Sequence, residues 1–168
     1  MTLLPYPYRH QLSAAIGWLE LGDPDAARAE LDALPPAFEE HPHVLQARWQ
    51  ICAELRDWEG ALAIARQELA VAGDSIESWI HQAYALRRVP HGGLEKARDA
   101  LLPACRKFPN EDIVPFNLAC YAAQLGQLEE AWDWLLKAMR LGQDGEQVRR
   151  RALADEDLKP LWDRLRAL

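Results

Sequence analysis

An alanine recurs through the sequence at an almost constant interval, each time shortly after an acidic residue. The four alanines are Ala27, Ala61, Ala97 and Ala131, and their separations are 34, 36 and 34 residues. A fixed period of this length is typical of a repeat architecture in which each unit is one supersecondary motif. Because one such unit cannot bury its apolar face alone, neighbouring units must stack and share a core.

The residues that follow each alanine indicate the secondary structure. Steps of four and then three residues keep the next two positions on the same side of an α-helix. Those positions hold, in order along the chain, Leu31, Ala65, Leu101 and Leu135, then Leu34, Glu68, Ala104 and Ala138. We therefore expect a helix in each of the segments 23–34, 57–69, 94–109 and 127–142.

A second set of helical segments precedes these four at matching offsets. Three of them carry a small residue where two helices approach closely, namely Ala15, Ala83 and Ala119. Trp49 takes that place in the second unit, so we expect a looser crossing or a rotated side chain there. Gly22 and Gly126 are typical of helices that end in the left-handed conformation, and Asp23 is placed to cap the next helix.

Helix pairs with this period and these alanines resemble the tetratricopeptide repeat (TPR) family over about residues 8–145. The segment FNLACYAAQLGQLEEAWDWLLKAMRLG, followed by ALADEDLKPLW, is similar to the end of bacterial TPR proteins, where a short capping helix closes the last repeat. The resemblance implies an all-α fold, a right-handed α-solenoid of four TPR-like helix-turn-helix repeats plus C-terminal capping helices. It implies a single domain, 1–168, with repeats at about 8–41, 42–75, 76–111 and 112–145 and a cap at 146–168.

The resemblance also implies a binding surface, because the first helices of TPR arrays line a concave groove. The corresponding positions are Arg9, Leu12, Ile16, Gln46, Gln50, Ile80, Tyr84, Arg87, Arg88, Phe116, Asn117, Cys120 and Gln124. Amides and aromatic rings suit a peptide backbone, and arginine suits a carboxylate or phosphate. We therefore expect a non-catalytic adaptor or scaffold that binds a peptide or partner helix, with Tyr84 and Asn117 as leading contacts. Alternatively, Arg87 and Arg88 only complement the dipole of their own helix.

Self-association is the alternative function. Trp132 and Trp134 are two residues apart on one helix and therefore diverge by about 200°. One of them should be partly exposed or packed against the tail, and an exposed ring would favour a homodimer through the C-terminal region. The two-carboxylate clamp of TPR cochaperones is not expected, because only Asn117 matches it in residue type.

Motifs for catalysis and metal binding are absent from the sequence. The chain contains no GxGxxG, GxxxxGK[ST] or GxSxG pattern. Cys120 and His81 could meet across first helices, but an inert buried thiol is the commoner arrangement. His41 and His43 lie in a loop, without the CxxC or HExxH spacing of a zinc site. We expect no enzymatic activity, catalytic residue, metal site or cofactor.

Composition narrows the partner and the compartment. The chain has 26 acidic and 19 basic residues, and a net charge of −7 argues against a nucleic-acid partner. No apolar run approaches the roughly 18–20 residues of a membrane span, and the first ten residues lack the basic region of a signal peptide. Three cysteines, an odd number, do not form a disulfide framework. We expect a cytoplasmic protein with a protein or peptide partner.

Overall fold

The computed structural model describes residues 4–168, and every regular element in that range is helical. The chain forms two compact units, one ending at Val89 and one beginning at Pro90. The all-α prediction is confirmed, and the boundary lies within the third predicted repeat, between its two helices. No helix among the described residues is both long and apolar enough to cross a membrane.

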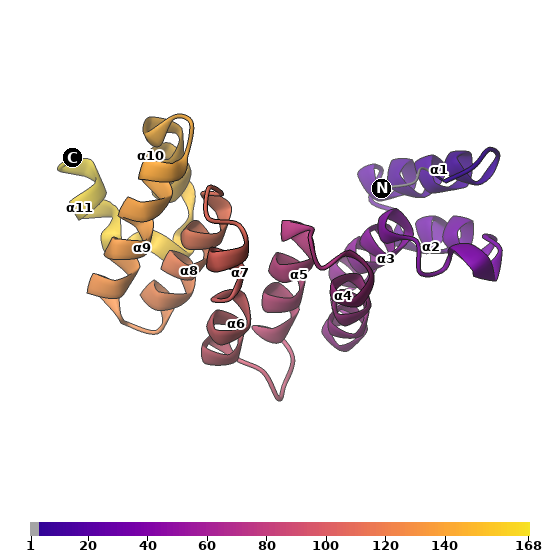
Figure 1. Ribbon diagram of the computed structural model, residues 1–168, viewed down its shortest axis with the longest axis horizontal. Helices are drawn as coiled ribbons and strands as arrows, with labels where there is room; N and C mark the ends of the chain where they lie inside the picture. The colour runs from indigo at the N-terminus through magenta and orange to yellow at the C-terminus, as the bar shows by residue number, and fades with distance from the viewer. Residues whose placement is uncertain (1–3) are drawn as a thin grey trace. The chain divides into compact units, whose positions relative to one another are not determined.

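The described residues of the first unit form five α-helices (Figure 1). They are α1 (Tyr8–Glu20), α2 (Pro24–Asp32), α3 (Pro42–Glu54), α4 (Trp58–Ala72) and α5 (Ile76–Leu86), with a short 3-10 helix, η1 (Pro36–Phe38), before α3. The helix α1 packs against α2 and α3, and α4 packs against α3 and α5. Consecutive helices are therefore neighbours in space, as the repeat pattern predicts.

The turns of this unit follow from local chemistry. The backbone of Gly22 has φ 77°, which a glycine adopts without a Cβ clash. The next residue, Asp23, accepts a hydrogen bond from the backbone N–H of Ala26 at 2.9 Å, and Asp57 does the same for Gly60 at 3.0 Å. Each carboxylate satisfies a backbone donor at a helix start, so the predicted Asp23 cap is confirmed.

The repeating alanines form the helix contacts that the period predicts. Ala27, Ala61 and Ala65 have no exposed surface, and Ala15 and Ala83 on the first helices are equally buried. Trp49 stands in the place of a small residue and is only 8% exposed. Its indole lies parallel to the imidazole of His81 on α5, with 3.8 Å between ring centroids. The larger side chain is thus accommodated by stacking on the neighbouring repeat.

The second unit contains six α-helices and a 3-10 helix. They are α6 (Leu94–Leu101), α7 (Ala104–Lys107), α8 (Ile113–Gln124), α9 (Leu128–Leu141), α10 (Gly145–Ala154), η2 (Glu156–Leu161) and α11 (Trp162–Arg166). The expectation of one helix over 94–109 is wrong, because the chain breaks between α6 and α7 at Pro103. Proline lacks the N–H of a helical hydrogen bond, and its ring collides with the preceding turn.

The core of the second unit forms between α8, α9 and the C-terminal segment. Ala119 and Ala131 have no exposed surface, and Gly126 has φ 77° between their helices, as expected. The tail adds three apolar side chains that are at most 1% exposed, namely Leu158, Leu161 and Leu165. The predicted C-terminal cap therefore exists, and it consists of α10, η2 and α11.

Candidate functional site

Four of the predicted ligand-facing side chains line one hollow in the first unit. Leu12 and Ile16 come from α1, and Gln46 and Gln50 come from α3. The hollow has a volume of about 280 Å³ and also contacts His43 and Ala47. Ile16 is 42% exposed and Gln50 is exposed, whereas Leu12 is buried. The surface therefore combines an apolar side with two amides that can donate to and accept from a peptide backbone.

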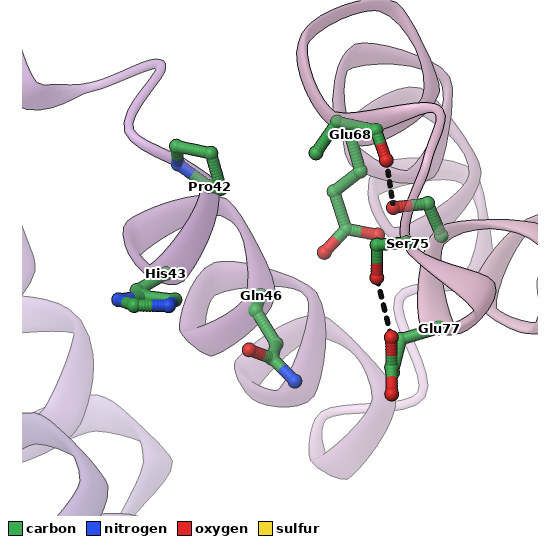
Figure 2. A pocket seen from close by; sticks show the side chains of 8 residues that line it. Pro42, His43, Gln46, Glu68, Ser75 and Glu77 are labelled. Atoms are coloured by element: carbon green, nitrogen blue, oxygen red, sulfur yellow. Dashed lines mark hydrogen bonds between the residues drawn. The ribbon is translucent and has the colours of Figure 1, made fainter. Parts of the chain in front are cut away.

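A smaller hollow lies beside it and shares His43 and Gln46 (Figure 2). Its opposite wall comes from the end of α4 and the start of α5, with Glu68, Ser75 and Glu77. The hydroxyl of Ser75 donates a hydrogen bond to the Glu77 carboxylate. Figure 2 shows Gln46 reaching from α3 toward this wall. Gln46 therefore lines both hollows, and the smaller hollow also has acidic side chains in its wall.

Glu68 is buried, although the same position in the other repeats is apolar. It is 3% exposed, and its carboxylate lies 2.8 Å from Nδ1 of His81. His81 in turn stacks on Trp49, whose Nε1 finds no hydrogen-bond partner among the described residues. Buried carboxylates require such partners because they lose the solvation that water provides. Sequence periodicity missed this network, since it marks Glu68 only as a core position.

A third hollow, of about 540 Å³, lies at the turn between α3 and α4 and the end of α5. It is lined by Ala53, Glu54, Arg56, Trp58, Tyr84 and Arg88. The guanidinium of Arg88 lies over the ring of Tyr84 at 3.4 Å from its centroid and over Trp58 at 5.0 Å. It also donates a hydrogen bond to the carbonyl of Tyr84 at 2.9 Å. Arg88 therefore both completes the end of its helix and presents a fixed cation to the hollow.

The remaining predicted side chains of the first unit lie apart from these hollows. Arg9 is exposed, and its guanidinium lies 5.7 Å from the ring centroid of Tyr6. Ile80 is half-buried on α5, and Arg87 is half-buried at the C-terminal end of that helix. The structure thus divides the predicted groove of this unit between an amide-lined hollow and an arginine-lined hollow.

In the second unit, the chain's own C-terminal segment contacts the predicted ligand positions of α8. Phe116 is 1% exposed beneath the guanidinium of Arg151, which lies 3.8 Å from the ring centroid. Gln124 donates a hydrogen bond to the carbonyl of Asp157 at 3.0 Å. The amide of Asn117 donates to the Ile113 carbonyl of its own helix at 2.8 Å. These side chains are engaged within the unit, so the open hollows of the first unit are the better candidates for a ligand.

Cys120 belongs to the same contact. Its thiol is 3.7 Å from Oδ2 of Asp155, and burial, then the negative charges of Asp155 and Asp157, raise the pKa of the thiol. A thiol held protonated is a poor nucleophile, because nucleophilic attack needs the thiolate. Cys120, Asp155 and Asp157 also place one donor atom each within 4.8 Å of one another. His81, its conceivable catalytic partner, is engaged with Glu68.

The two neighbouring tryptophans of α9 differ in their surroundings. The ring of Trp132 lies 4.3 Å beneath the guanidinium of Arg164 from α11, so it packs against the tail. Trp134 donates a hydrogen bond to Glu130 at 3.2 Å and lines two surface hollows. Both rings are half-buried and pack against the core of the unit, so the expectation that one of them packs against the tail holds for Trp132, while Trp134 lines the surface hollows.

Comparison with known proteins identifies the fold. No family model matches the sequence, and no curated protein matches it. Among solved structures, TTC0263, a thermophilic TPR protein in Thermus thermophilus, has a TM-score of 0.66 at 19% identity, over 96% of this chain and 100% of that chain. The chain has the TPR fold.

Two further comparisons involve solved structures of a protein named MamA. MamA from Desulfovibrio magneticus RS-1, from residue 41 to its end, has a TM-score of 0.68 at 18% identity, over 80% of this chain and 75% of that chain. MamA AMB-1 has a TM-score of 0.63 at 18% identity, over 96% of this chain and 91% of that chain. At these identities the similarity establishes the fold, and the function must be argued from the site.

Proposed function

We propose that this TPR-fold chain is a non-catalytic interaction module that binds an extended peptide along the first helices of its N-terminal unit. The observation that carries the proposal is the hollow in which Gln46 and Gln50 face Leu12 and Ile16. An extended peptide presents unpaired backbone groups and alternating side chains. The two amides can form hydrogen bonds with the peptide backbone, and the apolar side of the hollow can contact every second side chain of the peptide.

A random 12-residue peptide library displayed on phage tests this proposal. Peptides selected on the wild type are synthesised, and their affinity is measured by fluorescence anisotropy for the wild type and for a Gln46→Ala/Gln50→Ala variant. Each lost hydrogen bond is worth about 0.5–1.5 kcal/mol, so we expect binding to weaken about tenfold. Gln67→Ala is the matched control, because Gln67 is an exposed glutamine of α4 outside these hollows. Equal affinity of the double variant and the wild type would refute the assignment.

Self-association through the second unit is the other candidate function. It is favoured by Trp134, which lines hollows on the surfaces of α9 and of the α6–α7 turn together with Lys137. A half-exposed tryptophan at an open surface is typical of interaction sites. Light scattering across a hundredfold range of concentration tests this function. A mass that doubles in the wild type but not in Trp134→Ala supports a homodimer, and a constant monomer mass excludes it.

A further inference from the structure

The turn between α3 and α4 has an arginine where the equivalent turns have glycine. Gly22, Arg56 and Gly126 occupy the same place after the first helix of their hairpins, with φ 77°, 56° and 77°. Their N–H groups make the same bond, to the carbonyl three residues back, at 3.0, 3.1 and 3.0 Å. The residue after each also donates to the carbonyl five residues back, at 2.8–2.9 Å. The three turns therefore have one geometry, and only the second places a Cβ in it.

A left-handed residue with a side chain is strained, because its Cβ approaches the following carbonyl oxygen. Such strain persists where the rest of the structure or a function maintains it. Within the described residues, the side chain of Arg56 makes no hydrogen bond, ion pair or ring contact, and it is exposed at the hollow of Trp58, Tyr84 and Arg88. Contacts inside the unit therefore do not explain why an arginine occupies this position.

The position of Arg56 places a second guanidinium at the hollow that already contains Arg88. Arg88 is held by the Tyr84 carbonyl and by the rings of Tyr84 and Trp58, so little conformational freedom remains to be lost on binding. The surrounding unit is acidic, with 13 acidic and 7 basic residues up to Val89. The two arginines therefore place positive charge at this hollow in a unit that is acidic overall.

We propose that this hollow is a subsite for the carboxylate of an Asp or Glu side chain in the bound peptide. Guanidinium groups take a carboxylate through paired, charge-assisted hydrogen bonds. Glu54 also lines the hollow, and its negative charge favours a singly charged carboxylate over a doubly charged phosphate. The acidic character of the unit likewise disfavours a polyanion such as a nucleic acid.

The subsite rests on the proposed peptide-binding function and continues it along α3. Gln50 of the amide-lined hollow and Glu54 of this hollow are four residues apart, which places them on one helix face about 6 Å apart along the axis. An extended peptide covers at most about 3.3–3.6 Å per residue. An acidic residue about two positions beyond the segment over Gln50 would therefore reach Arg56 and Arg88.

The test compares libraries selected on the wild type and on Arg56→Gly. The variant keeps the turn geometry, and removing the strain should raise the Tm by about 2–4 °C. We expect wild-type selections to enrich Asp or Glu at one position, and Arg56→Gly selections to lose that enrichment while still yielding binders. A selected acidic peptide should bind Arg56→Gly about tenfold more weakly than the wild type. Arg66→Ala, which removes an exposed charge on α4, should leave its affinity unchanged.

Several results would overturn the subsite, and they differ from failure of the proposed function. Binders without an acidic preference, or with the same preference on Arg56→Gly, would leave peptide binding standing and exclude the subsite. A lower Tm for Arg56→Gly would show that the arginine has a structural role. If a phosphoserine peptide binds more tightly than its Glu counterpart, and this difference depends on Arg56, the subsite takes phosphate rather than carboxylate. If neither protein selects any peptide, the proposed function itself fails.

Discussion

The contact between Cys120 and Asp155 allows the docking of the C-terminal segment to be measured chemically. Asp155 caps η2, because its carboxylate accepts a hydrogen bond from the N–H of Asp157 at 3.0 Å, and it also lies against the Cys120 thiol. Cys120 is 4% exposed, so an alkylating reagent reaches it only when η2 opens. Replacing Asp155 with Ala should therefore increase the rate of Cys120 alkylation.

Two effects of Asp155 contribute to the expected increase in alkylation rate, namely its cap on η2 and its negative charge. Loss of an N-terminal cap destabilises a helix by about 1 kcal/mol, which is roughly a fivefold increase in the open fraction. The Asp155 charge also raises the pKa of Cys120, so its removal alone increases the thiolate fraction and the alkylation rate. Asp155→Asn separates the two effects, because asparagine caps about as well as aspartate but carries no charge.

The assay uses a Cys52→Ala/Cys105→Ala background, since both of those cysteines are partly exposed. Iodoacetamide labelling of Cys120 at pH 8 is followed by mass spectrometry in Asp155→Ala, Asp155→Asn and the unaltered background. We expect Asp155→Asn to be moderately faster than the background and Asp155→Ala about fivefold faster again. Asp163→Ala is the control, because the Asp163 carboxylate is fully exposed in a surface pair with Arg166.

Two results would refute this reasoning. Equal rates for Asp155→Ala and Asp155→Asn would show that the cap does not hold η2 in place and that charge alone slows the thiol. Equal rates for Asp155→Ala and Asp163→Ala would show that neither the cap nor the charge at Asp155 controls access to Cys120.

Two stability predictions follow from the repeats. Glu68→Ala should lower the free energy of unfolding by about 2–3 kcal/mol, because it removes a buried hydrogen bond to a carboxylate. A double-mutant cycle with His81→Ala, measured by urea unfolding, should give a coupling energy of about 1 kcal/mol, and additive effects would contradict the pairing. Gly126→Ala should lower the Tm by about 2–4 °C, because alanine is strained at φ 77°. Gly17→Ala should instead raise the Tm, since Gly17 is helical and a Cβ there meets nothing within 4 Å. A rise of the Tm in both variants would contradict the strain argument.

The features that the sequence predicted well are those set by local geometry and period. The alanine spacing identified side chains with no exposed surface, such as Ala27 and Ala131, because a helix contact tolerates only a small residue at each repeat. Asp23 and Gly22 were predictable for the same reason, since a cap and a left-handed turn depend on neighbouring residues alone. The break at Pro103 was also present in the sequence, but the apolar spacing on either side obscured it.

The site was harder to predict because exposure depends on contacts that are distant in sequence. Cys120 holds the same repeat position as Ile16, Gln50 and Tyr84, which are exposed, yet it is 4% exposed because its thiol lies against Asp155 of the C-terminal segment. One signal did distinguish Cys120: α8 is apolar around nearly its whole circumference, and such helices are buried on all sides. Around Gln46 and Gln50, by contrast, α3 keeps polar side chains on one face.

Departures from the repeat are more informative than agreement with it, because the other repeats serve as internal controls for what the fold requires. Glu68 departs from an apolar position, and the structure supplies its partner in His81, so that departure is explained by a contact within the unit. Arg56 departs from a glycine position under backbone strain, and the described residues supply its side chain with no partner. A strained residue whose side chain has no partner in its own fold supports the proposed carboxylate subsite, which is why Arg56, rather than the more conspicuous tryptophans, is the residue to test first for ligand binding.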